Sequence, residues 1–176
     1  MRSGLFIPAD SERKFLKGMG SGADSLFIDL EDSVALDNKV QARDTACGFL
    51  REVKNEAQRP LLFVRLNAYD TGLTDDDLGA IMADAPDGVV LPKSEHGQDV
   101  TRLDTMLRVH EAENNIDDGA TDIIAIITET AIGTINAGMH VALAHPNVHV
   151  GATRFALRVC AKKLIWAKQN FLVEWN

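Results

Sequence analysis

Short apolar runs recur along the chain, and a segment with helical spacing separates each run from the next. Most of the runs are continuous rather than alternating in polarity, which is typical of strands buried on both faces of a parallel sheet. The runs are GLFIPA from Gly4, SLFIDL from Ser25, PLLFVRL from Pro60, GVVLPK from Gly88, DIIAIITET from Asp122 and a weaker VHVGA from Val148. The sequence therefore predicts an α/β fold in which a strand–helix unit occurs five times and a sixth strand begins.

Apolar positions three and four residues apart predict the helices between these runs. The expected stripes are Phe15, Leu16 and Met19 after a Ser11 cap; Ala42, Ala46, Phe49, Leu50 and Val53 after an Asp37 or Asn38 cap; and Val100, Leu103, Leu107 and His110. A shorter helix is expected over residues 75–83, where Asp75, Asp76 and Asp77 would form a solvated first turn that the helix dipole favours. A fifth helix is expected over residues 130–144.

Composition narrows the class of protein. The chain has 176 residues, of which 45% are hydrophobic and 25% charged, so it can bury one sizeable core, and we predict a single domain over residues 1–176. Its net charge of -8 would repel a phosphate backbone, which argues against nucleic acid as a partner.

No apolar run reaches the roughly 18 residues that a membrane span needs, and the N-terminal apolar stretch is too short for a signal peptide. Cys47 and Cys160 form no disulfide framework, and we expect a cytoplasmic protein.

Polar side chains follow the predicted strands, at the point where each one ends. They are Asp29, Glu31 and Asp32 after the second strand, Arg65 and Asn67 after the third, Lys93 and Glu95 after the fourth, and Glu129 after the fifth. Because the carboxyl ends of parallel strands meet on one face, these groups would share a mouth where ligands bind. The alternative interpretation is that strand ends are solvated and that the acids only begin the next helices.

The arrangement favours a barrel over a nucleotide-binding sheet. No Gly-x-Gly-x-x-Gly pattern follows the first strand, and no Walker loop is present in the sequence. A (βα)8 barrel typically needs about 250 residues. We therefore predict an incomplete TIM-type (βα)8 barrel with about five to six βα units.

Several segments together resemble the HpcH/HpaI aldolase/citrate lyase family, which includes citrate lyase β-subunits and malyl-CoA and citramalyl-CoA lyases. The matching segments are RSGLFIPADSERKF, GADSLFIDLEDSV with NKVQAR after it, VRLNA, GVVLPKSE and IAIITETAIG, in the family's order, across roughly residues 2–140. The resemblance implies a TIM-type barrel and a magnesium-dependent carbon–carbon lyase. It also implies a 3-hydroxyacyl thioester substrate that bears a carboxylate, usually a CoA ester such as citryl-, malyl- or citramalyl-CoA.

The resemblance also implies roles for individual residues. The family's substrate-binding arginine falls on Arg65, whose planar guanidinium can hold a carboxylate with two parallel hydrogen bonds. Its metal-binding glutamate falls on Glu129, and Mg2+ prefers such hard oxygen ligands. Glu31 and Asp32 match the family's acidic pair, which would order metal-bound water or handle a proton. Lys93 would be a further cation near the acyl or carboxylate group, or else an ion-pair partner of Glu95 or Glu31.

The last part of the chain departs from the family pattern. The family places a second metal-binding aspartate after its sixth strand, in a segment reading Trp-Gly-Ala-Glu-Asp-Leu, and the positional counterpart here is VCAKKL over residues 159–164. Lys162 and Lys163 replace the acids, and an ammonium group cannot coordinate a metal. We expect a truncated chain with a divergent or frame-shifted tail over residues 150–176, and impaired activity.

Two other functions stay open at this point: a non-catalytic barrel fragment that docks on a partner, and a pyruvate-type metal aldolase that acts on free aldehydes. A partial barrel would also leave the first strand with an open edge, which is a template for association. We therefore expect a homo-oligomer.

Overall fold

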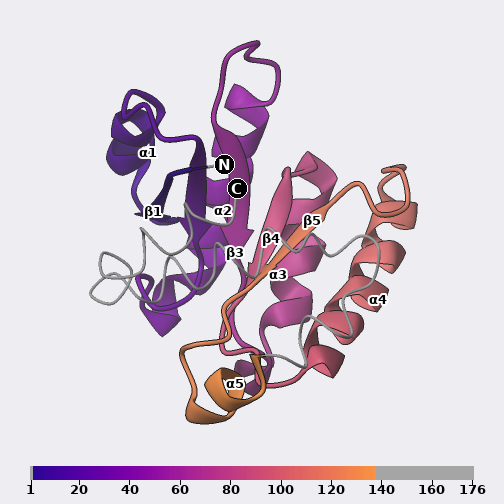
Figure 1. The fold of residues 1–176 in the computed structure, drawn as a ribbon. Coiled ribbons are helices and arrows are strands. Elements are labelled where there is room, and N and C mark those ends of the chain that lie inside the picture. The colour runs from indigo at the N-terminus through magenta and orange to yellow at the C-terminus, as the bar shows by residue number, and fades with distance from the viewer. Residues whose placement is uncertain (1, 138–176) are drawn as a thin grey trace.

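Five parallel strands form one sheet in the computed structural model, which describes residues 2–137 (Figure 1). The strands are β1 (Gly4–Pro8), β2 (Ser25–Asp29), β3 (Leu61–Arg65), β4 (Gly88–Leu91) and β5 (Asp122–Ala125). They pair in the order β1-β2-β3-β4-β5, so each strand lies beside the next one along the chain. This sequential order is that of a (βα)8 barrel and differs from the reversing order of a doubly wound sheet. The predicted incomplete barrel is confirmed for these five units.

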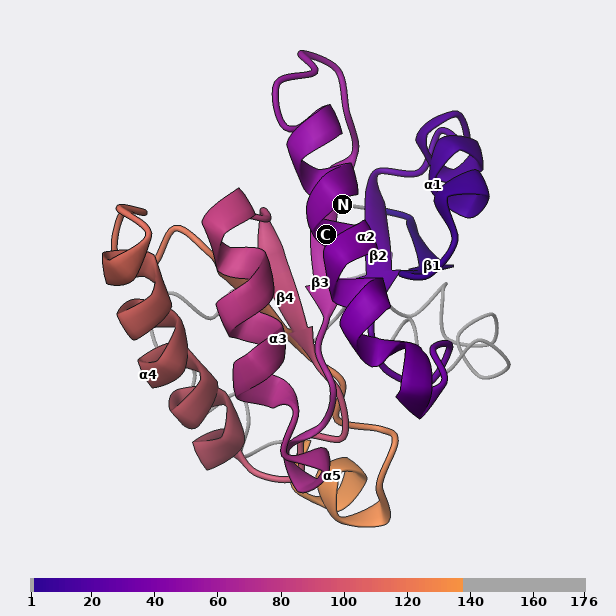
Figure 2. The same ribbon diagram turned by 180° about the vertical axis from the view of Figure 1, so that it is seen from behind.

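Helices follow the strands in turn. They are α1 (Glu12–Met19), α2 (Lys39–Val53), α3 (Thr74–Ile81), α4 (Gly97–Glu113) and α5 (Ala131–Ile135), with short 3-10 turns η1 (Leu36–Asn38), η2 (Tyr69–Thr71) and η3 (Met82–Asp84). Helices α2, α3 and α4 cover the same face of the sheet (Figure 2). None of the helices within residues 2–137 combines the length and the apolar character that crossing a bilayer requires. The expected sixth strand, the end of the fifth helix and the divergent tail lie outside the described residues.

Both faces of the sheet are buried, which explains the continuous apolar runs. On the helix-covered face, strand residues such as Ile28, Val64 and Ile123 pack into the main core together with the apolar stripes of the helices. On the opposite face a second cluster contains Phe27, Phe63, Val90, Ile124 and Ile126, with Phe6 packed against it. The rings of Phe6, Phe27 and Phe63 form a row across β1, β2 and β3, with centroids 4.9 and 5.6 Å apart. This second cluster occupies the face that lines the interior of a barrel.

Most of the predicted helical stripes are buried, with one exception. Every apolar residue of the α2 stripe is buried, and so are Val100, Leu103 and Leu107 of α4. Ser11 and Asn38 are the N-cap residues of α1 and α2, although neither side chain makes a capping hydrogen bond. The expectation for Leu16 is wrong, because its side chain is 70% exposed while Phe15 turns into the core.

The acidic start of α3 also differs from the sequence-based expectation. Asp77 is fully buried rather than solvated. It accepts hydrogen bonds from Arg43 Nε at 2.8 Å and from the backbone and side-chain nitrogens of Asn67 at 2.6 and 2.8 Å. A carboxylate at this depth is stable because each oxygen has a donor. Asp77 thereby joins α2 and α3 to the loop that follows β3.

Candidate functional site

The turn after β2 begins with a carboxylate that folds the chain back on itself. Asp29, the last residue of β2, accepts hydrogen bonds from the backbone N–H groups of Glu31 and Ser33 at 2.8 and 3.2 Å. Arg65 ends β3 directly opposite, and its Nε and Nη2 bind the two oxygens of Asp29 at 2.8 and 2.7 Å. Burial opposes ionisation of Asp29, but the hydrogen bonds and charge of Arg65 outweigh burial and lower the pKa of Asp29. Asp29 is therefore a buried anion that holds both the turn and the arginine.

The remaining amino group of Arg65 faces the other acids of the mouth. Nη1 lies 3.2 Å from Glu31 Oε2, 3.5 Å from Glu129 Oε1 and 3.9 Å from Asp32 Oδ2. The guanidinium carbon lies 4.9 Å from the centre of the Phe6 ring, which is within the range of a cation–π contact. The sequence predicted that Arg65 holds a substrate carboxylate with two parallel hydrogen bonds. In the structure, however, Nε and Nη2 of Arg65 already bind Asp29. Nη1 is thus the part of Arg65 that is turned toward the mouth.

Glu31 is a buried carboxylate whose hydrogen-bonding capacity is unused. Only 4% of the residue is exposed. Oε1 lies 2.8 Å from Lys93 Nζ and Oε2 lies 3.2 Å from Arg65 Nη1 as ion pairs, and neither oxygen has a further hydrogen-bond partner within the described part of the chain. Burial raises the pKa of Glu31, while Lys93 and Arg65 act against this rise. Buried polar atoms are nearly always hydrogen-bonded, so a buried carboxylate held only by two ion pairs fits a position that receives a ligand or a proton.

Lys93 and Glu129 close the opposite side of the mouth. Lys93 follows β4 with a left-handed φ of 50°, a conformation that typically costs a non-glycine residue about 1–3 kcal/mol and that clusters at functional sites. Its backbone N–H donates to Glu129 Oε2 at 2.9 Å, while its Nζ contacts Glu31 and lies 3.8 Å from Asp32 Oδ1. Contact with Glu31 raises the pKa of Lys93. Of the two partners that the sequence left open for Lys93, the structure places Glu31 in contact with it.

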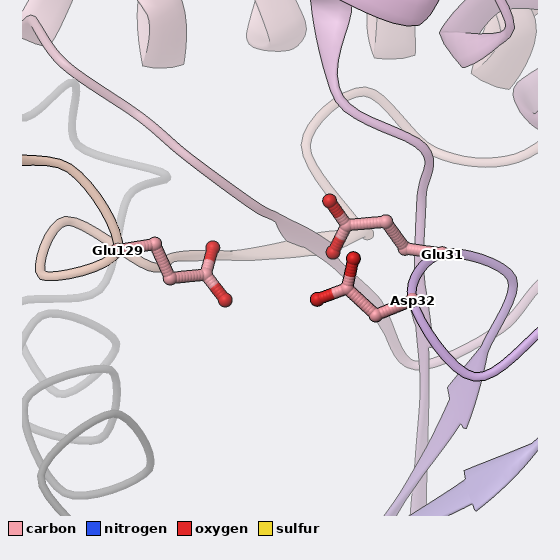
Figure 3. Close-up of side chains that lie close together, drawn as sticks. All are labelled: Glu31, Asp32 and Glu129. Carbon is pink, nitrogen blue, oxygen red and sulfur yellow. The ribbon is translucent and has the colours of Figure 1, made fainter.

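Three carboxylates form a group that could hold a cation. One oxygen from each of Glu31, Asp32 and Glu129 lies within 4.8 Å of the others. Figure 3 shows the carboxylates of Glu31 and Asp32, from the turn after β2, turned toward that of Glu129, from the segment after β5. Magnesium prefers oxygen ligands and often takes one or two protein carboxylates, so this donor set fits a hard divalent cation.

A pocket opens beside this group. Its volume is about 490 Å³, and its lining includes the charged Glu31, Asp32 and Lys93 and the apolar Val34, Leu36 and Leu73. A cavity of this size with apolar lining residues and a few charged groups is typical of small-molecule sites. The pocket therefore lies where a substrate could reach the acidic group.

The five residues to which the sequence analysis gave roles lie in this one mouth: Glu31, Asp32, Arg65, Lys93 and Glu129. Sequence reasoning missed Asp29 as the partner of Arg65. The available signal was that both residues end neighbouring strands. It also missed Lys39, whose Nζ lies 2.6 Å from the backbone oxygens of both Leu30 and Glu31.

Comparison with known proteins identifies relatives over most of the chain. The family model described as HpcH/HpaI aldolase/citrate lyase matches residues 2–153. A (3S)-malyl-CoA thioesterase from Cereibacter sphaeroides is 33% identical over 150 residues, which are 84% of this chain and 46% of that protein.

Two solved structures extend the comparison. The citrate lyase beta subunit from M. tuberculosis, complexed with oxaloacetate and magnesium, is 33% identical with a TM-score of 0.58, over 80% of this chain and 52% of that one. Malate synthase from Haloferax volcanii has a TM-score of 0.67 at 16% identity, over 86% of this chain and 48% of that one, and so supports the fold alone. The chain spans about half the length of the relatives that it matches.

Proposed function

Because this chain belongs to the HpcH/HpaI aldolase/citrate lyase family, we propose that its mouth is the site of a magnesium-dependent carbon–carbon lyase. The proposed substrate is a carboxylated 3-hydroxyacyl thioester, such as citryl-, malyl- or citramalyl-CoA. The observation that carries the proposal is the group of Glu31, Asp32 and Glu129 oxygens within 4.8 Å of one another, beside the partly engaged Arg65.

Glu129 and Asp32 are the carboxylates that we assign to the metal. Both are more exposed than Glu31, with side-chain exposures of 20% and 63%, so a hydrated ion can reach them. The related citrate lyase beta subunit is complexed with magnesium and oxaloacetate. When bound, magnesium would polarise oxygens of the oxo-acid half of the substrate and stabilise negative charge that develops during cleavage.

Arg65 and Glu31 would act directly on the substrate. Nη1 of Arg65 orients the free carboxylate, which places the 3-hydroxyl group near Glu31. Glu31 accepts the hydroxyl proton as the C2–C3 bond breaks, so C3 becomes the carbonyl carbon of an oxo acid. The electron pair of the broken bond passes to the thioester half as an enolate, and a proton returned to C2 gives the acyl thioester. Lys93, 2.8 Å from Glu31, stabilises the negative charge on this half.

The sequence beyond the described residues bears on metal affinity and on the rate of turnover. Lys162 and Lys163 stand where the family pattern has its second metal-binding acid, so we propose that this chain binds metal weakly and turns over slowly. Loss of a partner that only supports a metal ligand typically costs about 10- to 100-fold in affinity or activity, and loss of a direct ligand should cost at least as much.

The test is product formation from malyl-, citramalyl- and citryl-CoA with and without Mg2+, followed as oxo acid and acyl-CoA. Glu129→Gln should remove the Mg2+-dependent part of the rate, whereas Glu56→Gln, at an exposed position away from the mouth, should retain it. Equal Mg2+-dependent rates in both variants would refute the assignment of Glu129.

A second candidate function is thioester hydrolysis, which the name of the C. sphaeroides relative favours. The same assay separates the two reactions, because hydrolysis releases free CoA and leaves the hydroxy acid intact. Cleavage instead yields equal amounts of oxo acid and acyl-CoA.

A further inference from the structure

We propose that Lys39 is a positioning residue that holds the turn carrying Glu31 and Asp32 in the shape the site needs. Lys39 is the first residue of α2 and is only 9% exposed. Its Nζ lies 2.6 Å from the carbonyl oxygens of both Leu30 and Glu31, so one ammonium bridges two consecutive peptide groups. The inference rests on the proposed function, since that function assigns Glu31 and Asp32 to the reaction.

The turn is held from two sides by groups of opposite charge. On the donor side, the Asp29 carboxylate accepts the N–H groups of Glu31 and Ser33. On the acceptor side, Lys39 donates to the carbonyls of Leu30 and Glu31, and the latter carbonyl also accepts the Val34 N–H at 3.1 Å. Both ends of the Leu30–Glu31 peptide and the carbonyl of the next peptide are thereby engaged, which fixes the backbone from which the Glu31 and Asp32 side chains project.

The chemistry of a lysine side chain suits this role. Its ammonium carries three donors on a compact group and so can serve two adjacent carbonyls, which methionine cannot do. Burial lowers the pKa of Lys39, and the negative charges of Asp29, Asp77, Glu31 and Asp32 act against this effect. The carboxylates that surround Lys39 thus favour a charged donor in a buried place. Through Lys39 the position of the acidic pair depends on the packing of α2.

The test compares Lys39→Met with Arg59→Met in the full chain. Arg59 forms an ion pair with Asp87 and donates to the Pro60 carbonyl near the start of β3, far along the sheet from the mouth, so it controls for loss of a half-buried cation. Mn2+ is the probe, and its affinity is measured by electron paramagnetic resonance. We expect Lys39→Met to weaken Mn2+ binding about 10- to 100-fold, the range for partners that orient metal ligands, while Arg59→Met keeps the unsubstituted affinity.

Amide hydrogen exchange without metal gives a second, independent readout. The Val34 N–H should exchange faster in Lys39→Met than in the unsubstituted chain and in Arg59→Met, because its acceptor carbonyl has lost its anchor. If Lys39→Met does not fold, Lys39→Gln takes its place, since it is shorter and uncharged. Unchanged Val34 exchange or unchanged Mn2+ affinity in the folded Lys39 variant would overturn the positioning role. Absence of Mn2+ binding in the unsubstituted chain would instead refute the proposed function, while the exchange result would still decide the role of Lys39.

Discussion

Carboxylates at the two ends of the sheet differ in their hydrogen bonding. At the amino end, Asp24, Asp87 and Glu111 each accept backbone N–H groups. Glu111 is 1% exposed and binds the amides of Gly119 and Thr121 at 2.8 and 2.9 Å. At the carboxyl end, Glu31 is almost as deeply buried, yet neither of its oxygens has a hydrogen-bond partner within residues 2–137.

The difference separates stability from function within one fold. A buried acid whose oxygens all have donors contributes to folding, whereas a buried acid that has ion pairs but no hydrogen bonds contributes little or nothing. Such a group is retained where a ligand completes it, and in barrels the carboxyl end of the strands carries the reaction. Two acids at the carboxyl end do have hydrogen bonds: Asp29 binds Arg65, and Glu129 accepts the Lys93 N–H at 2.9 Å. The contrast between the two ends therefore rests on Glu31.

Removing Arg65 should have the largest effect on stability. Arg65→Met leaves Asp29, which is 2% exposed, as a buried charge without its cation. Breaking a buried ion pair from one side typically costs about 3–5 kcal/mol of unfolding free energy. Chemical denaturation would measure the loss. A change below about 1 kcal/mol, the level of an exposed pair, would show that Asp29 and Arg65 do not form the structural pair of this end.

Removing Glu111 should have the second-largest effect on stability and should leave metal binding at the mouth unchanged. Glu111→Ala leaves the buried amide of Thr121 and the partly buried amide of Gly119 without acceptors, and an unsatisfied buried group typically costs about 1–3 kcal/mol. The midpoint of denaturation should fall while Mn2+ affinity stays unchanged. A loss of Mn2+ affinity at constant stability would contradict the division between the two ends.

Neutralising Glu31 should change the unfolding free energy little, and any change should stabilise the chain rather than destabilise it. Glu31→Gln removes a charge that burial disfavours, although it also removes ion pairs to Arg65 and Lys93. We expect the unfolding free energy to stay within about 1 kcal/mol of the unsubstituted chain, or to rise, while substrate turnover is lost. A destabilisation as large as that of Glu111→Ala would mean that Glu31 is a structural acid.

The smallest expected effect is the pH dependence of Asp24. Hydrogen bonds from the backbone N–H groups of Arg2 and Ser3 lower the pKa of Asp24 to about 2. Because this folded-state pKa lies below the ordinary value, Asp24 contributes stability that is fully present above about pH 4 and is lost as the pH falls through about 2. Asp24→Asn should therefore be less stable than the unsubstituted chain at pH 6, with the difference vanishing toward pH 2. A difference that persists at pH 2 would assign the effect to something other than ionisation.

The sequence predicted the strands and the residues of the mouth, but not the contacts that those residues make with one another. Apolar runs located all five strands, because burial on both faces leaves a local signal. The pairing of Asp29 with Arg65 depends on the register of β2 against β3. The bridge from Lys39 depends on where α2 begins relative to the turn. No local sequence pattern predicts either contact. Asp77 looks like any acid in a first helical turn, and its burial follows from Arg43 and Asn67, both distant in sequence.

One carboxylate-to-amide change at each end of the sheet tests the central claim most directly. Mn2+ binding to the unsubstituted chain, Glu129→Gln and Glu111→Gln would be measured by electron paramagnetic resonance under identical conditions. We predict that the unsubstituted chain binds Mn2+, that Glu129→Gln weakens this binding at least 10-fold, and that Glu111→Gln leaves the affinity unchanged although it lowers stability. Equal affinities in the two variants, or no Mn2+ binding by the unsubstituted chain, would contradict a metal site at the carboxyl end of the sheet.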